Sequence, residues 1–383
     1  MSSNIDQPVI IRFFLTTDGL VAAHYYYYYY YGTHYSSLVS STQKLKKIPI
    51  PKGRIPYLGH LFVLTNSPSN QLAQWQKELV SGLNHILEPE ADILVQNLLD
   101  ASSSTDKGQQ QQVDILKPLQ LAAMNIILNI GFRKRAVSVD DPLFQSVLSN
   151  LEKAVGHANM ETNPLYRQLV KEALENDVIA GGSGTTAITA AWALVILCRY
   201  QDTQRAIRNE VDQFIATQGR LPTFADRLST FVNFCTKGMH AISSNKFFWF
   251  ASRNNKRWVL QYASNMLAIH MNPDVYDNPE KFIPDRFMNR LKPMAACAHA
   301  NISERDHFVF GWGRRACPGI HMAEVEIYNI LVRLLAKATI NPITDSNGNP
   351  VYPDIDNIDD AGVVILPKDR ILCITKRTDI STV

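Results

Sequence analysis

Hydrophobic residues recur at helical spacing along most of the chain beyond residue 80. Leu83–Leu99 and Ile320–Ile340 carry apolar residues three and four positions apart, which predicts two amphipathic helices. Pro164–Tyr200 reads as one long helix interrupted by glycines. Near the C-terminus a turn cluster, D-S-N-G-N-P, is followed by two short apolar stretches, Val363–Leu366 and Ile371–Thr375, which predict strands. The pattern therefore predicts a mainly α protein with a small β portion.

The first 43 residues follow a different pattern. Residues 1–43 contain two short apolar stretches and a run of seven tyrosines, but Arg12, Asp18 and His24 interrupt the apolar character. A membrane-spanning helix needs about 20 mostly apolar residues. The segment is therefore either a degenerate membrane anchor or a disordered low-complexity tail. Tyrosine favours the membrane interface and lysines follow downstream, so an anchor would place the rest of the chain on the cytoplasmic side.

The remaining chain divides into a connector and one large domain. Residues 44–59 are basic and proline-rich, with three prolines within eight residues, which excludes a helix and predicts a stiff linker. Residues 60–383 are long enough for a sizeable core. The net charge of +3 is small, and no basic stripe is interleaved with aromatic residues, so nucleic acid is not a predicted partner.

Five cysteines are scattered along the chain. Their number is odd and no two form a C-x-x-C pair, so we expect reduced thiols rather than a disulfide framework. Four need no role beyond core packing, because free cysteine behaves as a small apolar residue. The fifth, Cys317, lies in an unusual setting. The five are Cys198, Cys235, Cys297, Cys317 and Cys373.

Cys317 ends a glycine-rich loop that leads into the predicted helix from Ile320. The loop reads F-V-F-G-W-G-R-R-A-C-P-G, and its glycines Gly311 and Gly313 permit tight turns. Pro318 suits the first turn of a helix. The positive end of the helix dipole favours an anion, so we expect Cys317 to be a thiolate, the form that binds metals.

Two arginines, Arg314 and Arg315, lie beside this cysteine. They are suited to pairing with carboxylates of a bound cofactor. The simpler alternative is a buried cysteine at a helix start with ordinary surface arginines, which would be preferred for an isolated C-P-G.

The segment Ala180–Ala187 reads A-G-G-S-G-T-T-A within the predicted long helix. A phosphate loop would require a lysine that is missing here. A dinucleotide fingerprint fits G-x-G-x-x-A at Gly182, Gly184 and Ala187, with Asp202 for the ribose, but it requires a preceding strand. A third interpretation is a helix bulge, loosened by the glycines, that lets a threonine hydroxyl bond to oxygen or water.

The cysteine loop carries a family resemblance. Phe310, Gly313, Arg315, Cys317 and Gly319 match F-x-x-G-x-R-x-C-x-G, the haem-ligand signature of the cytochromes P-450, the haem-thiolate monooxygenases. The resemblance implies haem b, with its iron held by the Cys317 thiolate. It also implies a cytochrome P-450-like fold, here truncated, with several helices missing.

The glycine–threonine segment resembles a second motif of this family, A/G-G-x-D/E-T-T/S. Gly181, Gly182, Thr185 and Thr186 are in register, which implies a catalytic role for the two threonines. The acidic position holds Gly184 instead. Half of the family's proton-delivery pair is therefore missing.

The segment N-P-D-V-Y-D-N-P-E-K-F-I-P-D-R-F resembles the family's sequence ahead of the haem loop, with Arg286 at the arginine of P-E-R-F. In the family this arginine pairs with an E-x-x-R motif, and no E-x-x-R occurs in this chain. Residues 238–257 match nothing in the family. The helices that normally cover the substrate pocket ahead of Pro164 are also missing.

The resemblance implies a monooxygenase that inserts one atom of O2 into an apolar small molecule. Its electron donor would be an NADPH-dependent reductase. The resemblance is to the microsomal, fungal branch, which implies the cytoplasmic face of the endoplasmic reticulum membrane. The alternative is a degenerate, non-catalytic relative with impaired haem binding, and a dinucleotide-binding dehydrogenase is a distant third.

Overall fold

The computed structural model describes residues 82–103, 112–157, 165–229, 248–253, 260–265, 269–283, 316–360 and 365–378. It also describes residues 80, 294, 296, 300, 301, 305 and 308–311. All of these belong to one compact unit, Pro51–Val383. The predicted anchor at 1–43 and the connector at 44–59 lie outside the described residues.

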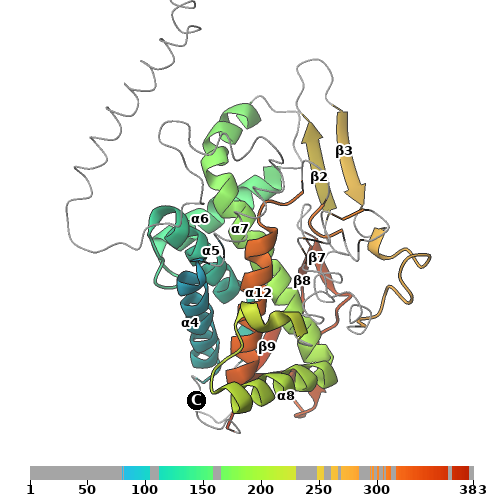
Figure 1. Cartoon of the computed structure of the whole chain (residues 1–383). Coiled ribbons are helices and arrows are strands. Elements are labelled where there is room, and N and C mark those ends of the chain that lie inside the picture. The colour runs from blue at the N-terminus through green and yellow to red at the C-terminus, as the bar shows by residue number, and fades with distance from the viewer. Residues whose placement is uncertain are drawn as a thin grey trace, which may run out of the picture. The chain divides into compact units, whose positions relative to one another are not determined.

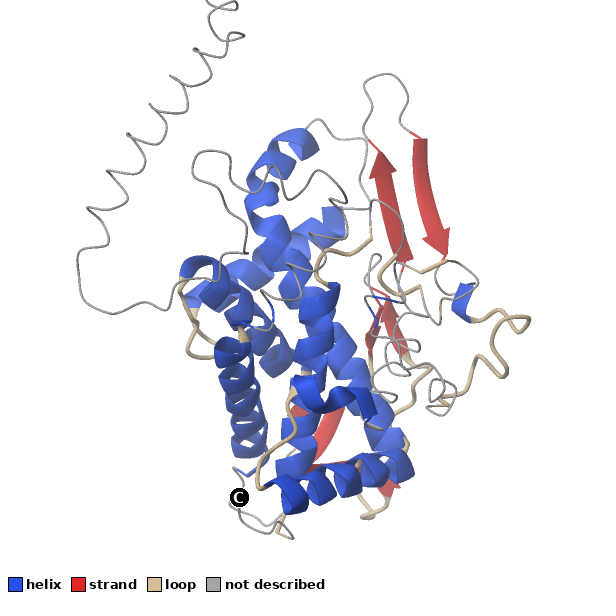
Figure 2. Ribbon diagram, in the orientation of Figure 1, coloured by secondary structure: helices blue, strands red, loops and turns tan. Residues whose placement is uncertain are grey.

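Helices dominate the described part of the chain and strands are short, as the hydrophobic pattern predicts (Figures 1 and 2). The predicted helices at Leu83–Leu99 and Pro164–Tyr200 are confirmed as α4 and α7. The helices are α4 (Asn84–Ser103), α5 (Leu116–Phe132), α6 (Pro142–His157), α7 (Leu165–Arg199), α8 (Gln201–Gln218), α12 (Ile320–Lys337) and the short 3-10 helix η1 (Phe224–Ser229).

The described strands form one three-stranded sheet and three hairpins, all antiparallel. The sheet has the order β1-β9-β4, with β1 (Val113–Asp114), β9 (Ile371–Lys376) and β4 (Ala338–Asn341). The hairpins pair β2 (Phe248–Arg253) with β3 (Leu260–Asn265), β5 (Ile343–Thr344) with β6 (Pro350–Val351), and β7 (Ile358–Asp360) with β8 (Ile365–Pro367). The predicted strand at Ile371–Thr375 is confirmed as β9. The end of the other predicted strand, Val363–Leu366, lies in β8.

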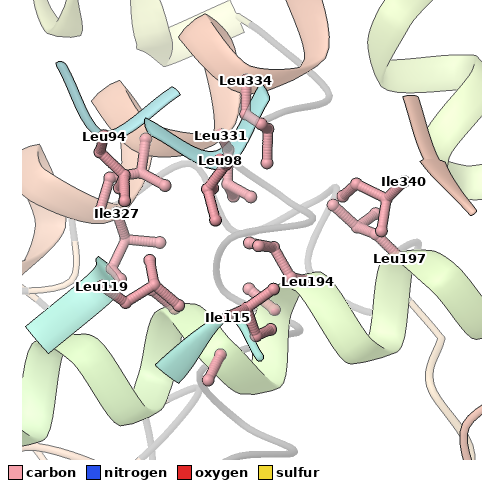
Figure 3. Close-up of a cluster of buried hydrophobic side chains, with 14 of the residues drawn as sticks. Leu94, Leu98, Ile115, Leu119, Leu194, Leu197, Ile327, Leu331, Leu334 and Ile340 are labelled. Carbon is pink, nitrogen blue, oxygen red and sulfur yellow. The ribbon is translucent and has the colours of Figure 1, made fainter. Parts of the chain in front are cut away.

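The core forms around α7, which contacts α5, α12 and α8. Every residue from Thr186 to Cys198 is buried, so this segment is covered on all sides. Figure 3 shows its leucines meeting side chains from α4, α12, β4 and the start of α5. The segment Gly181–Arg199 is apolar and long enough to cross a membrane, but 83% of its most apolar window is buried within the protein. This is the signature of a core helix.

Helix α12 ends earlier than the hydrophobic pattern predicts. The pattern runs to Ile340, but the helix stops at Lys337 and Ala338 is extended. Residues 338–341 form β4 and pair with β9, with Ile340 opposite Ile374. An apolar residue suits a buried strand as well as a buried helix, so periodicity alone does not detect the change.

Gln204 of α8 covers the outer edge of β4. Its amide donates to the Ile340 carbonyl at 2.9 Å and accepts from the Ile340 N–H at 2.9 Å, and Gln204 itself is buried. An open sheet edge exposes unpaired backbone groups. The glutamine therefore completes the hydrogen bonding of the strand and fixes α8 against the sheet.

One carboxyl group is buried between α12 and α7. Glu326 is only 2% exposed, and its side chain is hydrogen-bonded to Thr186 of α7. Burial raises the pKa of Glu326 to about 8, and the hydrogen bond with Thr186 lowers it by less. An isolated carboxylate is costly to bury, so the neutral acid is the stable form at neutral pH.

Replacing Gln204 with methionine tests the covering of the sheet edge. Gln204→Met keeps the side-chain shape but leaves the buried Ile340 N–H without its partner, which costs about 1–3 kcal/mol. Urea unfolding should show this loss. The exposed Gln213 on the same helix provides the control, and Gln213→Met should change stability by less than about 0.5 kcal/mol. Equal effects of the two changes would contradict the role given to Gln204.

A second prediction concerns pH. The folded chain keeps the Glu326 proton up to about pH 8, whereas the unfolded chain loses it near the ordinary value of 4.5. The stabilisation from this proton is complete below pH 4.5 and is lost as pH rises to 8, by about 1.4 kcal/mol per pH unit. Glu326→Gln should remove this slope from the urea unfolding free energy. Parallel pH curves for the two proteins would show that Glu326 is charged when buried.

Candidate functional site

The two ends of the cysteine loop are joined by backbone hydrogen bonds. The Gly311 N–H donates to the Phe308 carbonyl at 2.9 Å, and the Cys317 N–H donates to the Phe310 carbonyl at 2.8 Å. Gly311 has a φ of 67°, a conformation that favours glycine. The predicted tight turn at Gly311 is confirmed. Gly313, Arg314 and Arg315 lie outside the described residues.

A buried histidine supports the start of this loop. The Phe308 N–H donates to Nε2 of His270 at 3.0 Å, and His270 is 4% exposed. The imidazole also lies against the rings of Tyr276 and Phe308. The sequence did not predict this residue, because a single histidine 38 positions from its partner leaves no local pattern.

Cys317 is half-buried beside a small apolar cluster of Met294, Phe310 and Ile320. The helix that follows begins at Ile320 with Gly319 as its N-cap. Pro318 therefore lies in the turn before the helix, and its predicted place in the first helical turn is wrong. Phe310 is buried and contributes both to this cluster and, through its carbonyl, to the position of Cys317.

The predicted thiolate at Cys317 is not supported by the protein alone. Burial raises the pKa of the Cys317 thiol, and the hydrogen bond from the backbone of Gly319 lowers it by less. Desolvation therefore exceeds the favourable effect of the helix start. A coordinated metal ion deprotonates a thiol outright, so the anion would form together with the metal bond.

The glycine–threonine segment lies within a regular helix. Every residue of α7 from Leu165 to Arg199 is α-helical, so the predicted bulge is not present. The Thr185 hydroxyl donates to the Gly181 carbonyl of its own helix at 2.6 Å. The dinucleotide fingerprint is also excluded, because residues 182–187 lie in the middle of α7 and not at a strand-to-helix turn.

Close helix packing explains one of the glycines. A Cβ atom on Gly182 would lie 2.7 Å from Cδ1 of Ile127 on α5. A side chain at this position would require the Ile127 side chain to move. Gly182 therefore serves the contact between α5 and α7 and does not loosen the helix.

The two threonines lie on different faces of α7. Gly181 and Thr185 are exposed and one turn apart, and a Cβ atom on Gly181 would meet nothing within 4 Å. Thr186 is buried and hydrogen-bonded to Glu326. Only Thr185 is thus open to a ligand, whereas Thr186 faces the protein interior. Gly184, at the position of the missing acid, is buried.

Sequence reasoning missed Glu326. In the sequence the residue is visible only as an acid between the apolar residues Val325 and Ile327. The structure shows that every residue of this helix from 324 to 336 is buried. Only the position of α7 explains why this acid is tolerated, because its one described partner comes from a distant part of the chain.

A second buried acid on α12, Glu324, lies near the cysteine loop. Its Oε1 accepts the Met294 N–H at 3.3 Å and lies 3.8 Å from Nε of Arg227. Arg286, the family arginine predicted to lack its partner, is outside the described residues, so that prediction is untested. Arg227 and Glu324 nevertheless form a buried ion pair on the side of α12 that Met294 contacts.

Two features of the described residues are compatible with a haem group held by one cysteine. Cys317 is partly exposed on a constrained loop, and the Gly181–Thr185 face of α7 has open space beside it. Helix α12 begins three residues after Cys317 and contacts α7 through Glu326, so it connects the cysteine loop to α7. Among the described residues no group of three or more His, Cys, Asp or Glu side chains is suited to a metal ion.

Comparisons with known proteins agree with this arrangement. The family model for cytochrome P-450 matches residues 171–229 and 262–374. The unmatched interval between these blocks contains the stretch where the E-x-x-R motif is missing. The cytochrome P-450 monooxygenase macC of Penicillium terrestre is 29% identical over 60% of this chain and 45% of its own. The monooxygenase anuE of Penicillium roqueforti is 27% identical over 58% of this chain and 49% of its own.

The chain spans about half the length of these curated relatives. Among solved structures, a zebra fish cytochrome P-450 with abiraterone superposes with a TM-score of 0.59 and 19% identity, over 78% of each chain. The fold, the cysteine loop and the matched blocks lead to the same assignment. This chain belongs to the cytochrome P-450 family.

Proposed function

We propose that this chain is a haem-thiolate monooxygenase that oxidises an apolar small molecule. The observation that carries the proposal is the constrained loop that presents Cys317 immediately before α12. Haem b bound through the Cys317 thiolate would supply oxygen activation, with one atom of O2 inserted into the substrate and the other released as water.

The protein's own residues would hold and orient this group. Phe310 belongs to the apolar cluster that packs against Cys317, and the Gly319 backbone is hydrogen-bonded to the Cys317 thiol. By family resemblance Gly313, Arg315 and Arg286 complete the cofactor site. Thr185 is exposed on α7, and its hydroxyl, which donates to the Gly181 carbonyl, can still accept a hydrogen bond from water or substrate. Thr186, the next residue, is buried, and its hydrogen bond to Glu326 fixes this part of α7 against α12.

The proposal includes partners that the family resemblance implies. An NADPH-dependent reductase would supply electrons, and the protein would lie on the cytoplasmic face of the endoplasmic reticulum membrane, as the microsomal resemblance implies. An anchor in residues 1–43 would provide this membrane association.

A degenerate relative without catalysis is the competing function. It is favoured by the absence of E-x-x-R and of an acid at Gly184. The two functions differ in whether the chain binds haem through a thiolate, which a spectrum of the reduced protein with carbon monoxide decides.

We expect the full chain to give a thiolate-type Soret band with carbon monoxide, and Cys317→Ser to lose it together with most bound haem. Cys198, fully buried on α7, provides the control, and Cys198→Ala should retain the band. A native chain without haem would favour the degenerate relative. A thiolate band in Cys317→Ser would exclude Cys317 as the ligand.

A further inference from the structure

The turn between α5 and α6 has a charge pattern that the proposed function does not use. Residues 133–138 read R-K-R-A-V-S, so Ser138 follows two arginines by five and three positions. No other two arginines in the chain are separated by a single residue. A serine placed after arginines in this way is typical of the substrates of arginine-directed protein kinases, whose substrate grooves carry carboxylates.

The structure presents this serine at the surface. Ser138 is exposed and lies at a bend, and its hydroxyl oxygen accepts the Asp140 N–H at 3.2 Å. Residues 134–137 belong to no helix or strand, and Val137 is 78% exposed. Another protein can therefore bind this segment without first unfolding a helix or strand.

A buried side chain fixes the segment just ahead of the serine. The Asn125 amide donates to the Ala136 carbonyl at 3.0 Å and accepts the Ala136 N–H at 2.8 Å. Arg135 and Val137 are exposed on either side of the buried Ala136, so side chains alternate here as they do in an extended chain. The fixed point at Ala136 holds Ser138 and the residues before it on the outside of the protein.

Both arginines are placed so that a carboxylate from outside can bind them. Arg133 is exposed. Arg135 donates through Nε to the buried Glu90 at 2.7 Å, and 34% of the Arg135 side chain is exposed. A guanidinium also has N–H groups on its two terminal nitrogens, which suit a second carboxylate. Arg135 can therefore keep its ion pair while a second protein binds its outer edge.

Acidic residues on the other side of Ser138 form a competing pattern. Asp140 and Asp141 follow the serine by two and three positions, which is typical of the substrates of acid-directed kinases. The Asp141 carboxylate, however, accepts the N–H groups of Val137 at 2.8 Å and Leu143 at 2.9 Å. These bonds hold the pKa of Asp141 below its ordinary value. A kinase that bound this carboxylate would have to break them, so the structure favours recognition through the arginines.

We infer that Ser138 is a phosphorylation site and that its partner is an arginine-directed serine/threonine kinase. Carboxylates of the kinase bind Arg133 and Arg135, which in an extended segment lie on one side, about 7 Å apart. The inference goes beyond the proposed monooxygenase function and does not rest on it, because phosphate transfer to Ser138 requires neither haem nor Cys317.

The transfer is balanced and involves no oxidation or reduction. The Ser138 Oγ atom forms a bond to the γ-phosphorus of magnesium-bound ATP, and the bond from that phosphorus to the bridging oxygen of ADP breaks. ADP leaves, and the serine proton passes to the catalytic aspartate of the kinase. The product carries a phosphate with about two negative charges at neutral pH.

The first experiment uses the full chain, a purified arginine-directed kinase and magnesium-ATP labelled at the γ-phosphate. Mass spectrometry of the digested product should find the main label at Ser138, and Ser138→Ala should remove it. Ser146 provides the control, because it is exposed on α6 but follows Asp141 and Leu143 by five and three positions instead of arginines. Ser146→Ala should leave the label unchanged. A main label on any other residue would overturn the inference.

The second experiment tests the arginines. Arg133 has a φ of 54°, a conformation that asparagine also adopts, so Arg133→Asn removes the charge and keeps the turn. The variant loses charge-assisted hydrogen bonds to the kinase and should lower kcat/KM for phosphorylation of Ser138 by about 10-fold. Lys134→Asn is the matched control, because it removes the same charge one position away, and it should change kcat/KM much less. Equal losses in the two variants would show general charge attraction and contradict the role given to Arg133.

Arg135→Lys extends the test to the second arginine. Lysine keeps a cation beside the buried Glu90 but cannot offer a second edge to a carboxylate, so kcat/KM should again fall while the fold is retained. An unchanged kcat/KM in both Arg133→Asn and Arg135→Lys would exclude recognition through the arginines.

A third measurement replaces the kinase by an acid-directed one. This enzyme should label Ser138 more slowly than the arginine-directed kinase, because Asp141 is bound to the backbone. Equal or faster labelling by the acid-directed kinase would overturn the inference, and so would the absence of label from both. These outcomes are independent of the carbon monoxide spectrum, so failure of this inference and failure of the monooxygenase proposal are distinguishable.

Discussion

Burial of α7 on all sides is the constraint on which the rest of the fold depends. A helix segment with no solvent-facing side must be enclosed, and α5, α12, α8 and the strands β4 and β8 enclose it. Each polar group within it then needs an internal partner. The Trp192 indole donates to the Ile365 carbonyl at 2.9 Å, and the Thr189 hydroxyl donates to the Thr185 carbonyl at 2.9 Å. Helices and strands are thus fixed by the same central element.

The site lies where this enclosure ends. Toward its N-terminal side α7 changes from complete burial to an exposed face at Thr185 and Gly181. At this boundary, consecutive residues of the helix face opposite environments. Thr185 is therefore exposed to solvent, whereas Thr186 is buried in the core. Glu326 contacts Thr186 from the buried side.

Local patterns predicted much of this arrangement from sequence. The long helix, the helix after the cysteine loop and the turn at Gly311 depend on periodicity or on glycine's backbone freedom, and all three are present. The end of α12 was missed because the pairing of β4 with β9 overrides a continuous apolar pattern. The predicted bulge is absent because α7 is regular and closely packed against α5. At Cys317 burial opposes the favourable effect of the helix start on the thiolate.

Residues whose role depends on distant contacts could not be predicted. His270 and Glu326 have no local motif, since their partners lie 38 and 140 positions away in the sequence. Family resemblance identified Cys317 and the threonines, because those roles are tied to short motifs. It gave no information on how the chain compensates for motifs that it lacks.

The anchoring of α12 shows how such compensation works. Arg333 pairs with Glu88 at 2.9 Å and with Asp92 at 3.3 Å, both on α4, and Lys337 pairs with Asp92 at 2.6 Å. Near the other end of α12, Arg227 lies beside Glu324. The Arg227–Glu324 pair is buried on both sides, and breaking such a pair costs about 3–5 kcal/mol. The more exposed Lys337–Asp92 pair contributes less. These contacts hold the helix in a chain that has no E-x-x-R. Among the described residues, α12 and the start of the cysteine loop are therefore held by contacts with α4, η1 and His270.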